Sequence, residues 1–255
     1  MLFPETVVVN TFFDYIKTAL LPVEGFREMK LGVFPKTKKK VGAFIRRGES
    51  LAEHQAKTAF LARLFIENFP EFFDLKGLSQ DEVLNLVTYP LIRNVGQIKT
   101  GNIVKDGRRV NDKVKEAVYL RFSEFTKLGF PNSNAAVDYS RYYKEEEAKT
   151  GEFGQAFAAL SLLEHTLTLA YLRYKGVSGS IAKKPYLTVY VKNLIRQTGT
   201  KDAFEIFAAD LIRRVRNYPE HIKKPIYFVL EHAAVYATGT FLKWWDWRKD
   251  ENQLE

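Results

Sequence analysis

The sequence predicts an all-α fold, a helical bundle, and three observations lead to this prediction. Apolar residues recur every three or four positions along most of the 255 residues, which is the spacing of one face of a helix. The connections between these stretches are short and rich in Gly, Pro, Asn and Lys. Extended alternation of apolar and polar residues is absent, and the strand-like run 189–191 is too short to outweigh its helical surroundings.

The first predicted helix covers residues 6–21, with apolar residues on one side that include Phe12, Phe13, Ile16 and Leu20. Residues 22–48 follow as a loop, because glycines and prolines interrupt the helical pattern there. This loop contains the basic run 36–40, which we interpret as a solvated loop rather than a dedicated site.

The helix at residues 50–69 has the clearest signals. Ser50 is suited to cap its N-terminus, and Glu53 three residues later completes a capping-box pattern. A broad apolar face follows, and Pro70 comes directly after the predicted end.

The next helix begins at Ser79, where two acids in the first turn favour the helix dipole. We expect it to stop or kink at Tyr89-Pro90, because the residue before a proline is disfavoured in a helix. Pro219 and Pro225 are assigned to connections. We predict a single helical domain over residues 1–255, with further helices at 110–128, 138–149, 151–175, 186–198, 201–218 and 222–247.

The chain has a net charge of +9, four histidines and no cysteine. Positive charge favours polyanionic partners such as nucleic acid, nucleotides or anionic surfaces, although a solvated basic surface explains it equally well. The absence of cysteine excludes disulfides, thiolate zinc sites and cysteine nucleophiles. Apolar runs are shorter than the ~20 residues of a membrane span, and the N-terminus lacks the order of a signal peptide. We therefore expect a cytoplasmic protein without a membrane partner.

Residues 91–103 read like a metal-binding segment whose ligands have been replaced. A hydrolytic metal site would have His-Asp, then Glu three residues on and Gly-Asp beyond. This chain has Arg93-Asn94, Gln97 and Gly101-Asn102 at those places. Amides bind a divalent cation poorly, and a guanidinium, which cannot be deprotonated in a protein, repels it.

The segment 49–54, Glu-Ser-Leu-Ala-Glu-His, is followed by an apolar helix. It resembles the first metal-ligand segment of HD-domain phosphohydrolases, in particular the branch with bacterial 5′-deoxynucleotidases, where an Arg- or Pro-Glu-Ser-Val-Ala-Glu-His-like motif occurs. The second segment of that family is His-Asp-x-x-Glu-x-x-x-Gly-Asp. Residues 93–102 are similar to it, and their tail Thr100-Gly101-Asn102 supports the register.

The third segment of the family has an Asp shortly before Leu-Glu on a helix. Its best match here is 161–164, Ser-Leu-Leu-Glu, which places Ser161 where the last metal-ligating Asp would lie. The resemblance covers about residues 30–175 and implies an HD-domain-like helical core, with additional C-terminal helices at about 186–247.

The resemblance also implies a metal site that has lost most of its ligands. His54 remains a competent ligand, whereas Asn94 offers only a weak carbonyl donor and Ser161 is poorer still. Gln97 stands where the family has a functional carboxylate, so a general acid or base is missing there too. His54 and Gln97 are therefore remnants of a catalytic site, and we predict neither a resident metal nor another cofactor.

Two interpretations of this degenerate site follow. In the first, Arg93 places a positive charge where the metal would lie, and the pocket binds a phosphate-bearing ligand without hydrolysing it. The ligand-binding residues would then be Arg46, Arg47, His54, Arg93, Asn94, Lys99, Asn102 and Ser161. In the second, Arg93 pairs with Glu53 or another acid, and the former pocket is merely filled.

The preferred function is that of a catalytically degenerate protein that binds nucleotide or nucleic-acid phosphate, or acts as a scaffold in an assembly. One alternative is an active nucleotide phosphohydrolase whose divalent metal is held by acids such as Glu53, Asp106 or Glu164. Another is a nucleic-acid-binding protein that uses a basic surface, such as residues 211–216 with Lys223-Lys224, or the aromatic-basic cluster 141–143. The resemblance further implies a homodimer or a larger protein assembly.

Other candidate sites are weaker. Glu164-His165 and Glu231-His232 each join an acid to an imidazole, but adjacent helix residues point to different sides. Neither pair has the partners of a nucleophilic triad in the sequence, and neither glycine-rich nucleotide-binding motif is present. The tryptophan-rich segment 244–247 is typical of a core cap or a subunit interface.

Overall fold

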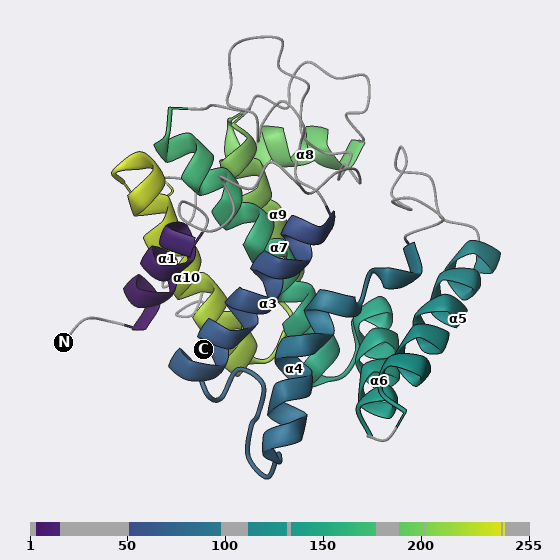
Figure 1. Cartoon of the computed structure of the whole chain (residues 1–255). Coiled ribbons are helices and arrows are strands. Elements are labelled where there is room, and N and C mark those ends of the chain that lie inside the picture. Colours follow the sequence, from purple (N-terminus) through teal and green to yellow (C-terminus); the bar gives the residue numbers. More distant parts are fainter. Residues whose placement is uncertain are drawn as a thin grey trace.

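The fold was obtained as a computed structural model, which describes residues 4–15, 51–97, 112–131, 134–176, 189–200, 202–240 and 242. Within these residues the regular elements are helices, which confirms the predicted all-α bundle (Figure 1). The basic run 36–40, Asp106 and the tryptophan segment 244–247 lie outside the described residues.

The helices follow the predicted order along the chain. The first part contains α1 (Pro4–Tyr15), α3 (Leu51–Asn68), α4 (Gln80–Ile92) and the short 3-10 helix η2 (Val95–Gln97). The second part contains α5 (Asp112–Gly129), α6 (Ala135–Ala148), α7 (Glu152–Tyr174), α8 (Val189–Thr198), α9 (Ala203–Val215) and α10 (Glu220–Thr238). The run 189–191 begins α8, so its helical surroundings prevail over its strand-like composition.

Helix α7 is central in the bundle (Figure 1). It packs against α1, α3, α6, α9 and α10, while α5 packs against η2 and α6. From Leu163 to Leu172 every residue of α7 except His165 is buried, which is the pattern of a core helix rather than of a surface helix. None of the helices in the described residues is long and apolar enough to cross a membrane.

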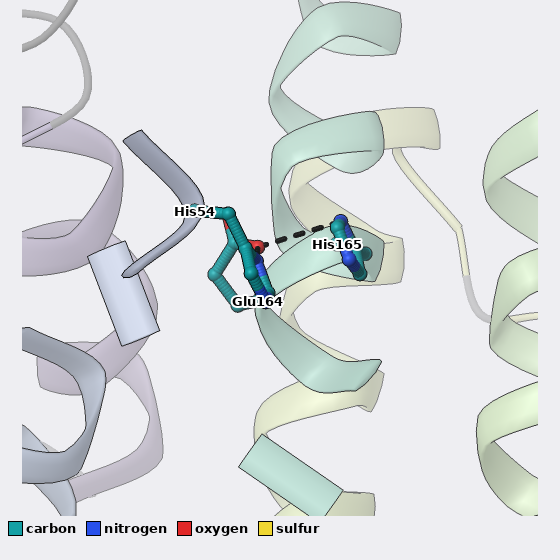
Figure 2. Close-up of side chains that lie close together, drawn as sticks. All are labelled: His54, Glu164 and His165. Carbon is teal, nitrogen blue, oxygen red and sulfur yellow. Dashed lines mark hydrogen bonds and ion pairs between the residues drawn. The ribbon is translucent and has the colours of Figure 1, made fainter. Parts of the chain in front are cut away.

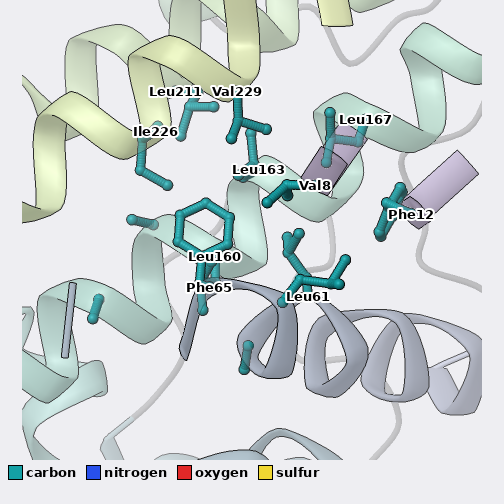
Figure 3. Close-up of a cluster of buried hydrophobic side chains, with 14 of the residues drawn as sticks. Val8, Phe12, Leu61, Phe65, Leu160, Leu163, Leu167, Leu211, Ile226 and Val229 are labelled. Carbon is teal, nitrogen blue, oxygen red and sulfur yellow. The ribbon is translucent and has the colours of Figure 1, made fainter. Parts of the chain in front are cut away.

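One cluster of buried apolar side chains extends from α1 to α10. Figure 3 shows its centre, formed by Val8, Phe12, Leu61, Phe65, Leu160, Leu163, Leu167, Leu211, Ile226 and Val229. Full burial of one such side chain is worth about 1.5–3 kcal/mol. The cluster therefore fixes α3 against α7, and these two helices carry most of the polar residues described below.

Helix α4 differs from the prediction at its C-terminal end. It begins after Ser79, as predicted, and Ser79 forms a capping box with Glu82, but the helix continues through Pro90 to Ile92. A proline inside a helix removes one backbone hydrogen bond. Burial of Tyr89, Pro90 and Ile92 offsets this loss, and the Arg93 N–H still donates to the Tyr89 carbonyl at 2.9 Å. The extra half-turn makes Arg93 the C-cap of α4.

Helix α10 also differs from the prediction. Pro225, which was assigned to a connection, lies inside α10 and is buried, while Pro219 forms the N-cap. The helix ends at Thr238 rather than near 247, because Gly239 adopts a left-handed conformation with φ 74° and its N–H donates to the Val235 carbonyl. A glycine in this conformation is a common C-terminal signal.

Candidate functional site

Three residues singled out in the sequence meet between α3, α4 and α7. His54 lies in the first turn of α3, Arg93 caps α4, and Ser161 lies in the middle of α7. Ser161 Oγ is 3.3 Å from His54 Nε2, although 107 positions separate the two residues in the chain. Glu164 follows Ser161 by three positions and therefore lies on the same side of α7.

The Arg93 guanidinium lies at the centre of this group. Its Nη2 is 2.7 Å from His54 Nε2 and donates to Ser161 Oγ at 2.8 Å. Its Nη1 donates to Glu146 Oε1 on α6 and forms an ion pair with that carboxylate. Arg93 Nε is buried and has no hydrogen-bond partner among the described residues. The guanidinium thus ties α3, α6 and α7 to the end of α4, and its Nε nitrogen has no acceptor in this part of the chain.

Glu146 is fixed from a second side. Its Oε2 accepts a hydrogen bond from the Tyr89 hydroxyl at 2.7 Å. Burial, together with the Glu146 carboxylate, raises the pKa of Tyr89 well above its ordinary value, so this phenol stays a neutral donor. Both carboxylate oxygens of Glu146 are therefore occupied by donors from α4.

Glu164 is the second acid of the group, and it is fully buried on the opposite side of His54. His54 Nδ1 is 2.5 Å from Glu164 Oε2. The Lys57 ammonium lies 2.8 Å from Glu164 Oε1, and it also donates to Thr168 Oγ1 at 2.9 Å. The Thr168 hydroxyl donates to the same Oε1 at 2.8 Å. Each oxygen of this fully buried carboxylate thus accepts at least one hydrogen bond.

Burial and charge act in opposite directions on these groups. Burial raises the pKa of Glu164, but the Lys57 ammonium and His54 outweigh burial and hold that pKa well below its usual range. Burial lowers the pKa of Lys57, and the nearby Glu164 carboxylate works against that decrease. The pair is therefore an ammonium and a carboxylate that stabilise each other's charge.

His165 completes the cluster in Figure 2. Its ring stacks on His54 with centroids 4.3 Å apart and an interplanar angle of 1°, and its Nδ1 lies 3.5 Å from Glu164 Oε2. The adjacent pair Glu164-His165 was expected to point to different sides, but the two side chains approach each other. Burial lowers the pKa of His165 to about 3, so its imidazole is neutral.

The hydrogen bonds determine the tautomer of His54. A guanidinium only donates, so His54 Nε2, 2.7 Å from Arg93 Nη2, must be an acceptor. The proton of this neutral imidazole is then on Nδ1, and Nδ1–H donates a hydrogen bond to Glu164 Oε2. The Nε2 lone pair faces Arg93 and Ser161.

These residues do not fit a divalent metal. His54, Glu164 and His165 have possible ligand atoms within 4.8 Å of one another. However, His54 Nδ1 carries a proton, Lys57 is ion-paired with Glu164, and Arg93 occupies the Nε2 side of His54. A metal ligand must offer a lone pair, and two fixed cations beside the site repel a third. The chemistry open to this arrangement is anion binding and proton transfer without a metal.

Comparison of the chain with protein-family models, with curated proteins and with solved structures gives no match. The resemblance to HD-domain phosphohydrolases therefore stays a prediction.

The remaining predicted site residues are only partly described. Asn94 follows Arg93 and is half-buried, and Gln97 ends η2 with a side chain outside the description. Arg46, Arg47, Lys99 and Asn102 lie outside the described residues. Of the two interpretations, the structure provides the ion pair of the second, with Glu146 as the acid that pairs with Arg93.

Sequence reasoning missed Lys57 and Glu146. Lys57 had a signal, because it lies three residues after His54 and four before Leu61, on the buried face of α3. A charged residue on such a face needs a partner. Glu146 had no such signal in the sequence, because it is the middle residue of the acidic run 145–147 and nothing in that run distinguishes it.

The aromatic-basic cluster 141–143 is not an open stacking surface. Tyr142 is fully buried, and the Tyr143 ring stacks on Phe122 with centroids 4.8 Å apart. Both tyrosines therefore belong to the packing of α6. By contrast, the arginines at the end of α9, Arg213, Arg214 and Arg216, are exposed.

Proposed function

We propose that this chain is a catalytically degenerate HD-domain-like protein that does not carry out metal-dependent phosphohydrolysis and binds a phosphate-bearing ligand at Arg93. One observation carries the proposal: the buried guanidinium lies close to both His54 and Ser161, and among the described residues its Nε–H has no acceptor. Guanidinium is suited to phosphate oxygens through charge-assisted hydrogen bonds.

The unused donor supplies a driving force for binding. A buried polar group without a partner costs about 1–3 kcal/mol relative to one that is hydrogen-bonded. A ligand oxygen that reached Arg93 Nε would recover this cost, and the part-exposed Ser161 hydroxyl is next to the same guanidinium. Nucleotide phosphate is the ligand class that also suits a net charge of +9.

The rival function, hydrolysis at a rearranged metal site, has less support. It would need two or more carboxylates directed at His54 without Arg93 between them. In the described residues, Glu164 is the carboxylate bonded to His54, and it is neutralised by Lys57. The other nearby acid, Glu146, reaches the group through Arg93.

The first test is elemental analysis of the purified protein together with a phosphatase screen on deoxynucleoside monophosphates. We expect no stoichiometric metal and no turnover above background. Stoichiometric metal together with turnover that His54→Ala abolishes would overturn the proposal.

The second test is calorimetric titration with inorganic phosphate and with a deoxynucleoside monophosphate. We expect Arg93→Met to weaken binding about tenfold or more, because a charge-assisted hydrogen bond contributes about 1.5–3 kcal/mol. Arg63→Met is the matched control, since it removes the same charge from an exposed position on α3. Equal affinities in the wild type and a folded Arg93→Met variant would contradict binding at this site.

A further inference from the structure

The hydrogen bonds around His54 have the order of a nucleophile, a base and a carboxylate. Ser161 Oγ lies 3.3 Å from His54 Nε2, and His54 Nδ1 donates to Glu164 Oε2 at 2.5 Å. In the Nδ1–H tautomer that Arg93 imposes, the Nε2 lone pair accepts from Arg93 Nη2 at 2.7 Å and has Ser161 Oγ as its second neighbour at 3.3 Å. This is the tautomer that a histidine needs to take a proton from a serine.

The carboxylate end of this series is held rigidly. Glu164 is fully buried, and Lys57 and Thr168 both bond to its Oε1, so Oε2 remains for the imidazole. A buried carboxylate that accepts a hydrogen bond from Nδ1–H fixes the ring orientation and stabilises the imidazolium that forms during proton transfer. Glu164 is thus a positioning residue for His54.

The serine end is less buried than the carboxylate end and has a cation beside it. Ser161 is partly exposed, in contrast to the buried His54 and Glu164. Arg93 Nη2 donates to Ser161 Oγ at 2.8 Å. The guanidinium therefore lies near the place where the carbonyl oxygen of an attacked ester would become negatively charged. Donors placed at such a position stabilise a tetrahedral oxyanion.

We propose that Ser161, His54 and Glu164 form a metal-free acyl-transfer site that accepts the acyl group of a small ester. The Arg93 Nη2–H turns from His54 Nε2 to the carbonyl oxygen of the ester, which frees the Nε2 lone pair. Ser161 Oγ then attacks the carbonyl carbon as its proton passes to His54 Nε2, and the carbonyl oxygen becomes an oxyanion held by Arg93. Collapse of the intermediate breaks the bond to the alcohol, which leaves with the proton from His54. Water then attacks the acyl-serine by the same route and releases a carboxylic acid.

This inference uses the same Arg93 and Ser161 as the proposed phosphate binding, but it does not rest on that binding. The proposed function excludes a metal-dependent reaction. Acyl transfer at Ser161 needs no metal, because it uses proton transfer through His54 and stabilisation of the oxyanion by Arg93. Phosphate binding is measured by calorimetry and acylation by mass, so either can fail while the other holds.

The test is covalent labelling of the full chain with a fluorophosphonate, which forms a phosphonyl-serine with loss of fluoride. We expect one adduct per chain in the intact mass, and peptide mapping should place it on Ser161. A burst of one equivalent of 4-nitrophenol from 4-nitrophenyl acetate is the second measurement. Ser161→Ala should abolish both signals, while Ser123→Ala on α5 should leave them unchanged.

His54→Gln and Glu164→Gln test the relay itself. Each should slow labelling of Ser161 about 100-fold or more, the range expected when a general base is lost or misplaced. Thermal unfolding identifies the variants that are folded. If one of them is not folded, the burst and its loss in Ser161→Ala decide the question. The proposal is overturned if folded wild-type protein gives no adduct on Ser161, or if folded His54→Gln is labelled there at the wild-type rate.

Discussion

Two cations, Lys57 and Arg93, lie inside the bundle, and each is paired with its own acid. Lys57 and Glu164 are both fully buried, whereas Arg93 and its partner Glu146 are slightly exposed. His54 links the two pairs as a neutral imidazole. Breaking one half of a buried ion pair costs more than the pair itself contributes, because the remaining charge stays buried without compensation.

We predict that Lys57→Met destabilises the protein by about 3–5 kcal/mol, the range for removing one partner of a buried ion pair. Glu164 would keep its bonds to His54 and Thr168 but lose the ammonium that compensates its charge. The measurement is urea unfolding at neutral pH, with the free energy of unfolding compared between variant and wild type.

The control for this prediction is Arg63→Met, which removes a cation from the exposed ion pair with Glu67 on the same helix. Exposed pairs contribute about 0.2–1 kcal/mol, so the control should change stability little. A loss below 1 kcal/mol for Lys57→Met would show that Glu164 does not depend on the ammonium.

The residues of the site were predictable where a local pattern marked them. His54 and Arg93 stood out because each occupied a place in a recognisable segment, and Ser161 followed from the register of the first two. Glu146 reaches Arg93 from α6, 53 positions away, and only the packing of α4 on α6 brings the two together. A contact of this kind depends on helix geometry that one sequence does not specify.

At the scale of elements, the contact between α6 and α7 depends on Gly154. A Cβ at this position would lie 2.3 Å from the carbonyl carbon and 2.4 Å from the carbonyl oxygen of Glu145. Both are backbone atoms, so the two helices would have to separate. Because Glu146 is the next residue on α6, such a shift would also move the carboxylate that holds Arg93.

We predict that Gly154→Ala lowers the free energy of unfolding by about 1–3 kcal/mol, the usual cost of overpacking. In an open helix the same substitution would stabilise the protein by about 0.5–1 kcal/mol. Gly129→Ala at the end of α5 is the matched control, since a Cβ there meets no atom within 4 Å. Thermal or urea unfolding distinguishes the two, and equal effects of both substitutions would contradict a tight contact.

The presence of the helices was predictable from apolar periodicity, because a helix forms where one of its faces is buried. The positions of the helix ends were less predictable. Pro90 predicted that α4 stops or kinks there, and the helix does not stop, because burial of the residues around Pro90 extends it to Ile92. The αL glycine at 239 ended α10 earlier than the apolar pattern suggested.

At the scale of the whole molecule, the interior and the surface carry different electrostatics. The interior network contains two cations and two acids, so its charges cancel with His54 neutral. The net charge of +9 is therefore carried by other residues. In the described part of the chain, the exposed arginines at the end of α9 are one such group. We therefore expect the binding of long polyanions to depend on this surface charge, and the binding of a single phosphate at Arg93 to depend on one buried donor.

We predict that binding of a single-stranded oligonucleotide weakens as salt concentration rises, because each neutralised phosphate contributes a slope of about −0.7 in log K against log salt. Arg216→Ala should make this slope shallower by about 0.7 if one phosphate contact is lost. Arg93→Met should leave the slope unchanged, since Arg93 is buried and paired with Glu146.

Fluorescence anisotropy at several salt concentrations measures these slopes, with Arg63→Ala as the control for loss of one exposed charge elsewhere. If Arg93→Met altered the slope as much as Arg216→Ala, the buried guanidinium would have to contact the polymer, and the separation of interior and surface electrostatics would be wrong.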